Sequence, residues 1–127
     1  MFANHPIYPS LPAADLERAK RFYAEKLGLT PESELPGGLW YRCGKDTRFS
    51  VFTSQGEANG TYTQVLWLVE DVESEVAALK ARGVVFEEYD VPSLKTVNSI
   101  ATVGPGKGAW LKDSEGNLLS LVQFDEA

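Results

Sequence analysis

The chain has 127 residues, a formal net charge of −6 and hydrophobic residues at 43% of its length, which suits one domain with a sizeable core. The acidic balance argues against nucleic acid as a partner, because phosphate contacts need clustered Lys and Arg, and no apolar run approaches the roughly 20 residues of a membrane span. The single cysteine, Cys43, excludes an internal disulfide and predicts a cytoplasmic protein.

The first half of the chain predicts an irregular opening strand, one helix and three further strands. The opening strand, about residues 7–11, contains Pro9, so we expect it at a sheet edge. Asp15 can cap a helix whose apolar residues recur at helical spacing, and Gly28 ends that helix. The three strands are expected at residues 30–35, 39–43 and 48–53.

The second half predicts the same order of elements. A strand at residues 64–69 leads to Asp71, which caps a second helix that ends near Gly83. Strands are expected at 84–89, 109–112 and 117–124. The long stretch 90–108 reads as a loop, and loops of this length in compact domains often serve as lids.

The repeated order predicts one domain, residues 1–127, built from two modules, residues 1–57 and 58–127. The fold class is α+β, with two βαβββ modules that form a curved mixed sheet around a central cavity. Strand alternation directs Gln64, Leu66 and Leu68 toward that cavity. In the last strand, Leu118, Ser120 and Val122 share one face.

Two segments carry a resemblance to a known family. Residues 15–29 run from Asp-Leu-Glu through Phe-Tyr to Leu-Gly, and residues 112–122 contain the pattern Asp-x-x-Gly-Asn. With the doubled βαβββ order, the chain resembles the vicinal oxygen chelate superfamily, which includes glyoxalase I, bleomycin resistance proteins, extradiol dioxygenases and fosfomycin resistance proteins. The resemblance implies two βαβββ modules and a homodimer.

The resemblance also implies four inward positions at which enzymes of the superfamily hold a divalent metal. In this sequence those positions correspond to Tyr8, Val51, Gln64 and Ser120. Only Gln64 is of a residue type that commonly serves as a ligand in the family. A hard divalent cation needs anionic oxygen or imidazole donors, so we expect neither a metal nor another cofactor.

The leading hypothesis is therefore a metal-independent small-molecule-binding protein of the glyoxalase/bleomycin-resistance type. It would sequester a cationic or aromatic organic compound, such as an antibiotic, and Trp40 and Trp110 occupy equivalent repeat positions from which they would stack on it. The expected ligand-binding residues are Tyr8, Trp40, Val51, Gln64, Leu66, Trp110, Leu118 and Ser120.

An enzyme of the same fold is the alternative hypothesis. Glu88 or Asp90 near Lys95 would form an acid–base pair for a metal-independent lyase or isomerase. A divalent-metal enzyme resembling glyoxalase or dioxygenase, with Gln64 as a ligand, is a further alternative. The sequence leaves open whether the cavity forms within one chain or across two.

Overall fold

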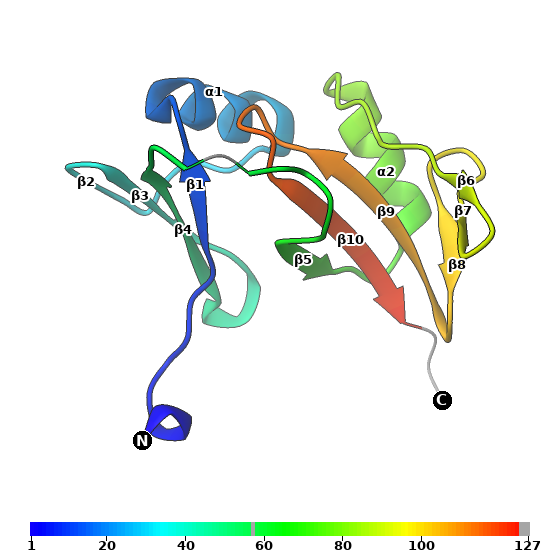
Figure 1. Cartoon of the computed structure of the whole chain (residues 1–127), viewed down its shortest axis with the longest axis horizontal. Coiled ribbons are helices and arrows are strands. Elements are labelled where there is room, and N and C mark those ends of the chain that lie inside the picture. Colours follow the sequence, from blue (N-terminus) through cyan, green and yellow to red (C-terminus); the bar gives the residue numbers. More distant parts are fainter. Residues whose placement is uncertain (57, 125–127) are drawn as a thin grey trace.

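The first module comprises one helix and four strands that form a mixed sheet. The computed structural model describes residues 1–56 and 58–124, so the expected module boundary after residue 57 falls on a residue outside those described. The elements are β1 (Ser10–Ala13), α1 (Leu16–Leu27), β2 (Ser33–Leu35), β3 (Gly38–Arg42) and β4 (Arg48–Thr53), with short 3₁₀ turns at Phe2–Asn4 and Gly44–Asp46. The chain before β1 extends away from the body as an arm (Figure 1).

The second module has the same plan with an added hairpin. Its elements are β5 (Val65–Leu68), α2 (Val72–Ala81), β6 (Asp90–Val91), β7 (Leu94–Lys95), β8 (Ala101–Val103), β9 (Gly106–Lys112) and β10 (Leu118–Phe124). The hairpin β6–β7 lies beside β8 at the outer end of the second sheet (Figure 1). Among the described residues, no helix is long and apolar enough to cross a membrane.

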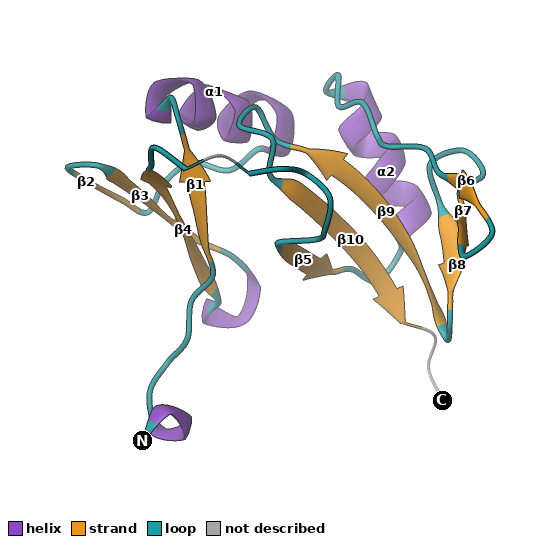
Figure 2. Ribbon diagram, in the orientation of Figure 1, coloured by secondary structure: helices purple, strands orange, loops and turns teal. Residues whose placement is uncertain are grey.

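The two sheets share one topology, which confirms the predicted α+β fold of two βαβββ modules. The strand orders are β1-β4-β3-β2 and β5-β10-β9-β8. In each sheet the first strand of the module pairs in parallel with the last, and the other neighbours are antiparallel. The sheets stand side by side, with α1 along the upper side of the view and α2 behind the second sheet (Figure 2). The strands β1 and β5 therefore form the inner edges of their sheets.

Both helices begin as the sequence predicts. The side chain of Asp15 accepts a hydrogen bond from the backbone N–H of Arg18, and Asp71 accepts one from Ser74. These bonds satisfy N–H groups that have no partner within the helix. Gly28 ends α1 with a φ of 70°, a left-handed conformation that glycine adopts without steric cost.

One hydrophobic core joins the two modules. Phe49 of β4 meets the edge of Trp67 of β5, with ring centroids 5.6 Å apart. The hydroxyl of Tyr23 on α1 donates a 2.7 Å hydrogen bond to Asp113, in the turn before β10. Burial raises the pKa of Tyr23 well above its usual value, so this hydroxyl stays protonated as a donor. One face of each sheet is therefore buried in this core. The opposite face of each sheet is not part of it.

Two expectations for the second module are corrected by the structure. Residues 84–89 do not form a strand. Among the described residues they meet β9 at a single bridge, from Phe86 to Leu111, beside which the N–H of Glu87 bonds to the carbonyl of Trp110. On the side of β9 that faces away from β10, residues Gly106–Gly108 pair with β8 instead. The stretch 90–108 is therefore not a plain loop, since it contains the β6–β7 hairpin, β8 and the first residues of β9.

Candidate functional site

The faces of the two sheets that point away from the core carry matching rows of side chains. In the first sheet, Ser50 of β4 lies between Trp40 of β3 and Ser10 of β1. In the second sheet, Ser120 of β10 lies between Trp110 of β9 and Leu66 of β5. Each module thus presents an indole next to a central hydroxyl. We call these two surfaces the first and second outer faces.

The first outer face is an open hollow with aromatic and polar parts. The ring of Tyr8 meets Trp40 edge to face, with centroids 5.7 Å apart, and the hydroxyls of Ser10 and Ser50 lie 2.7 Å from each other. A hollow of about 470 Å³ opens beside Trp40. Its lining residues are Glu32, Ser33, Leu35, Trp40 and Arg48.

Two guanidinium groups neutralise the carboxylate in this hollow. Glu32 accepts hydrogen bonds from Arg48 Nε at 2.9 Å and from Arg42 Nη2 at 2.9 Å. Hydrogen bonds from Arg48 and then Arg42 lower the pKa of Glu32. The carboxylate stays ionised but is already paired, so the polar end of the hollow carries no free negative charge from this residue.

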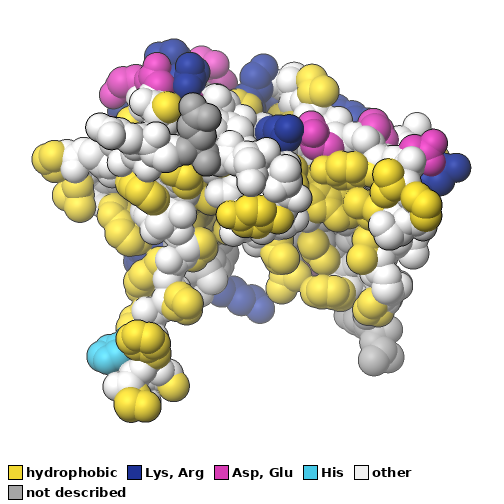
Figure 3. All heavy atoms as spheres, in the orientation of Figure 1, with side chains coloured by type: hydrophobic (Ala, Val, Ile, Leu, Met, Phe, Trp, Pro, Cys, Tyr) yellow, Lys and Arg dark blue, Asp and Glu magenta, His cyan; other side chains and the backbone are white. Residues whose placement is uncertain are grey.

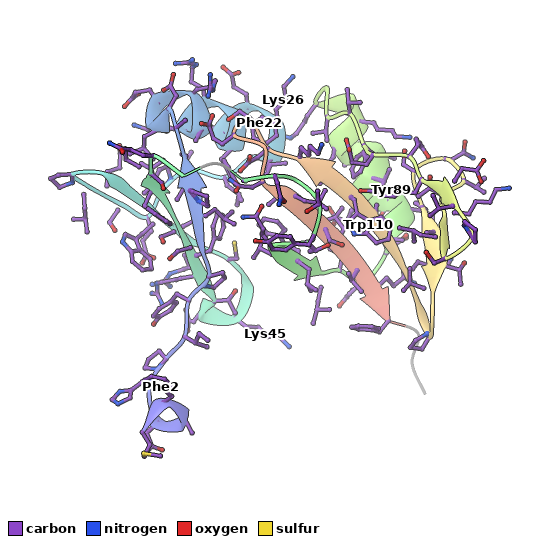
Figure 4. The ribbon with its side chains drawn as sticks, viewed as in Figure 1. Phe2, Phe22, Lys26, Lys45, Tyr89 and Trp110 are labelled. Atoms are coloured by element: carbon purple, nitrogen blue, oxygen red, sulfur yellow. The ribbon has the colours of Figure 1, made fainter. Side chains whose placement is uncertain are left out.

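On the second outer face, Trp110 is held in place from two sides. Its indole N–H donates to the hydroxyl of Thr63 at 3.2 Å, and its ring meets Tyr89 edge to face at 5.6 Å. Figure 4 shows Tyr89 and Trp110 next to each other at the outer part of the second sheet. An indole with a satisfied donor and a fixed plane offers its π-face to a ligand at little entropic cost.

The second outer face also carries exposed aliphatic and aromatic groups. Leu66, Leu68 and Phe124 are 49%, 68% and 59% exposed. Figure 3 shows apolar side chains gathered over this part of the molecule, while charged groups concentrate on the helices above it. An apolar surface of this kind marks a binding site or an interface with another molecule.

The residues expected to bind a ligand fall on two separate faces. Tyr8 and Trp40 lie on the first outer face, and Leu66, Trp110 and Ser120 lie on the second. Val51 is fully buried on the core face of β4, opposite Leu11 and Leu39. Ser50 takes the outer position instead. The amide of Gln64 donates to Asn117 Oδ1 at 3.0 Å and accepts from the N–H of Leu118 at 3.2 Å.

Leu118 shares strand parity with Ser120 but is only 4% exposed. It therefore offers little surface to a ligand within this chain. The structure adds outer-face residues that were not among the expected ligand-binding residues: Ser10, Ser50, Phe52, Leu68 and Phe124. The sequence signal for these faces was that Trp40 and Trp110 occupy equivalent positions in the two modules. Each of them lies opposite the central serine of its sheet.

The candidate acid–base residues lie in and beside the β6–β7 hairpin. The carboxylate of Glu88 accepts hydrogen bonds from the hydroxyls of Thr96 at 2.6 Å and Ser99 at 2.8 Å, and from the Ser99 N–H at 3.2 Å. The Thr96 and Ser99 bonds lower the pKa of Glu88. An ionised carboxylate with its oxygens engaged in this way anchors the loop. Asp90 and Lys95 are opposite each other in the backbone pairing of β6 and β7, and both residues are exposed.

The residues at the metal-binding positions of the fold do not fit a divalent cation. Of the four expected positions, Val51 is buried in the core, Gln64 uses its amide within the chain, and Tyr8 and Ser120 carry neutral hydroxyls. The neighbouring Ser10 and Ser50 also carry only neutral hydroxyls. Neutral hydroxyls do not offset the loss of a hard cation's water shell. Among residues 1–56 and 58–124, no group of three or more His, Cys, Asp or Glu side chains is placed to hold a metal ion.

Comparison with known families agrees with this fold. The family model "Glyoxalase/Bleomycin resistance protein/Dioxygenase superfamily" matches residues 4–121, and the chain belongs to this superfamily. No curated protein sequence shows significant similarity to the chain.

Solved structures show the same fold at low sequence identity. A bleomycin-binding protein complexed with bleomycin has a TM-score of 0.71 at 22% identity, over 95% of this chain and 99% of that one. A bleomycin resistance determinant encoded on the transposon Tn5 has a TM-score of 0.68 at 22% identity, over 96% and 99% of the two chains. The fosfomycin resistance protein FosX from Listeria monocytogenes has a TM-score of 0.70 at 14% identity, over 95% and 93%. These identities establish shared architecture only.

Proposed function

We propose that the protein is a metal-independent binding protein of the bleomycin-resistance type, which sequesters an organic compound that carries a flat aromatic group. The carrying observation is the pair of matching rows, in which an indole lies beside a serine hydroxyl on both outer faces. Trp40 and Trp110 supply stacking surfaces, while Ser50 and Ser120, which are only 5% and 2% exposed, lie between the neighbouring side chains of each row. Apolar walls with a few placed polar groups are typical of sites for organic ligands.

A second copy of the chain would complete this site. The inner edge strands β1 and β5 each pair with one neighbour among the described strands, and Leu66 and Leu68 of β5 are largely exposed. The N-terminal arm extends away from the body, with Phe2 96% and Ile7 91% exposed (Figure 4). Burying such groups against a partner copy is favourable by about 25 cal/mol per Å² of apolar surface. We therefore propose a homodimer in which outer faces of two copies enclose the ligand.

The charge distribution favours a neutral or cationic aromatic ligand over an anionic one. The chain carries a net charge of −6. Arg48, the cationic group in the hollow beside Trp40, is already paired with Glu32. An aromatic cation would gain from the faces of the indoles, since a cation within about 6 Å of an aromatic ring is attracted by its π-electrons.

A thermal-shift screen in EDTA tests this function. The screen contains bleomycin and other aromatic or cationic antibiotics. A ligand at about 100 times its dissociation constant stabilises the fold by about 2.7 kcal/mol. The proposal expects stabilisation by at least one compound, loss of it in Trp110→Ala, and recovery of the compound unchanged after incubation.

The matched control is Tyr62→Ala, because Tyr62 is 63% exposed and lies outside the two outer rows. It should keep the full ligand-induced shift. Conversion of the bound compound into a product would contradict simple sequestration. A shift that depends on added divalent metal would contradict metal independence.

A further inference from the structure

A separate apolar cavity lies where the two modules meet on the core side of the second sheet. Its volume is about 200 Å³. It is bordered by the C-terminal end of α1, by α2 and by the core face of β5, β9 and β10, and it opens to solvent where Leu29, Val69 and Leu79 are only partly buried. The lining residues are Leu27, Leu29, Trp67, Val69, Glu75, Leu79, Leu111 and Leu121. Because Trp67 and Leu121 point opposite to Leu66 and Ser120, this cavity is on the other side of the sheet from the second outer face.

The walls of this cavity offer few polar partners. Seven of the eight lining residues are aliphatic or aromatic. The indole N–H of Trp67 points to the sulfur of Cys43, at 3.5 Å, and so is already engaged. Water at such walls finds few hydrogen-bond partners, so its displacement by an apolar group is favourable. The cavity is therefore suited to one small hydrocarbon ring.

One carboxylate lies at the edge of this apolar space. Glu75 on α2 lines the cavity and is exposed. No hydrogen bond or ion pair to its carboxylate is present among the described side chains, whereas Glu73 on the same helix is bound by Lys107 at 2.8 Å. The nearby cations at the helix ends are engaged elsewhere, since Lys26 bonds the carbonyl of Arg82 and Arg82 bonds that of Glu25. Glu75 thus gives the cavity entrance a negative charge.

We propose that this cavity is a second binding site, distinct from the outer faces, for a compact ring hydrocarbon that carries one ammonium group. The ring occupies the space between Trp67, Leu79 and Leu111, and the ammonium pairs with Glu75. Leu27 and Leu29 come from the first module and the other lining residues from the second. A bound ring therefore bridges the two modules and stabilises their packing.

Three matched probes test the site: benzylamine, benzyl alcohol and benzoate, which share a ring and differ in charge. Binding is followed by ¹H–¹⁵N NMR at the indole N–H of Trp67, at up to about 10 mM probe. The proposal expects benzylamine to bind most tightly, benzyl alcohol more weakly and benzoate least. Shifts should concentrate at Trp67 and leave the indoles of Trp40 and Trp110 unchanged.

Two variants separate the parts of the site. Glu75→Gln should weaken benzylamine about three-fold, the range of an exposed ion pair, and leave benzyl alcohol unchanged. The control Glu73→Gln should alter neither probe, because Glu73 does not line the cavity. Leu79→Phe should abolish the binding of both benzylamine and benzyl alcohol, because the larger side chain fills the cavity. If Leu79→Phe fails to fold, the comparison of probes in Glu75→Gln still decides.

The proposal is overturned if no probe shifts the Trp67 indole, if benzoate binds as well as benzylamine, or if the shifts appear only at Trp40 and Trp110. The last result would place the probes on the outer faces instead. Failure here leaves the proposed function of the outer faces standing, because that proposal rests on different residues.

Discussion

The ion pair between Arg18 and Glu115 gives the sharpest prediction about stability. The Glu115 side chain is 1% exposed and accepts from Arg18 Nε at 2.7 Å and Nη2 at 3.0 Å. It also accepts from the backbone N–H of Asp15, the N-cap of α1. One carboxylate in the turn before β10 thus fixes the start of the first module's helix. The perturbation is Glu115→Gln, which keeps the shape and removes the charge.

The size of the effect follows from the pKa of Glu115. Its hydrogen bond to Arg18 is the main cause that lowers this pKa from 4.5 to about 2. At about 1.4 kcal/mol per unit, the charged form contributes about 3 kcal/mol to the free energy of unfolding at pH 7. Because the folded pKa is lowered, this contribution is complete above about pH 4.5 and is lost as the pH falls toward 2.

Urea unfolding at fixed protein concentration, followed by circular dichroism at pH 7, 5, 4 and 3, measures this effect. Glu115→Gln should be less stable than the wild type by about 2 to 3 kcal/mol at pH 7, since glutamine keeps part of the hydrogen bonding. The difference should shrink steadily below pH 5. Glu73→Gln, which breaks an exposed pair with Lys107, should change little at any pH. A gap that stays constant from pH 7 to 3 would refute the reasoning.

Four further perturbations follow, three from the packing and one from the proposed dimer. Tyr23→Phe should lower the free energy of unfolding by about 2 kcal/mol, because it leaves the buried carboxylate of Asp113 without its hydroxyl donor. Tyr41→Phe should be neutral or stabilising in the same urea titration, since the buried Tyr41 hydroxyl has no hydrogen-bond partner within residues 1–56 and 58–124; equal losses in the two variants would contradict this. Gly106→Ala should destabilise by about 2 kcal/mol or more in thermal unfolding, because its Cβ would overlap the backbone of the paired strand β10, and an unchanged Tm would show that this packing is looser. Deletion of residues 2–7 should weaken the dimer measured by sedimentation, where the wild type is expected at twice the 14.0 kDa chain mass; a monomeric wild type would contradict the proposed assembly.

The sequence predicted the parts of the fold that local chemistry determines. Asp15 and Asp71 cap the helices because a side chain reaches N–H groups three residues ahead, which needs no tertiary information. Alternation within β5 and β10 also assigned their faces, since side chains at every second position of a strand share a face.

The errors arose where distant segments decide the outcome. The register of β4 is set by pairing with β3, so counting along the chain put Val51 rather than Ser50 on the outer face. Residues 84–89 have strand-like composition, but β8 takes the adjoining edge of β9. Glu88 accepts its hydrogen bond from Ser99 because the turn places Ser99 at a φ of 75°. No local sequence pattern predicts that conformation.

The central claim is that the outer faces bind an organic compound without a metal. The most direct measurement is calorimetric titration of the compound that gives the largest thermal shift in the antibiotic screen, in EDTA, into wild type, Trp40→Ala and Trp110→Ala. We expect saturable binding by the wild type in EDTA and a loss of at least ten-fold in affinity in each tryptophan variant. Binding that appears only when nickel, zinc, manganese or iron(II) is added, or a screen without any stabilising compound, would contradict it.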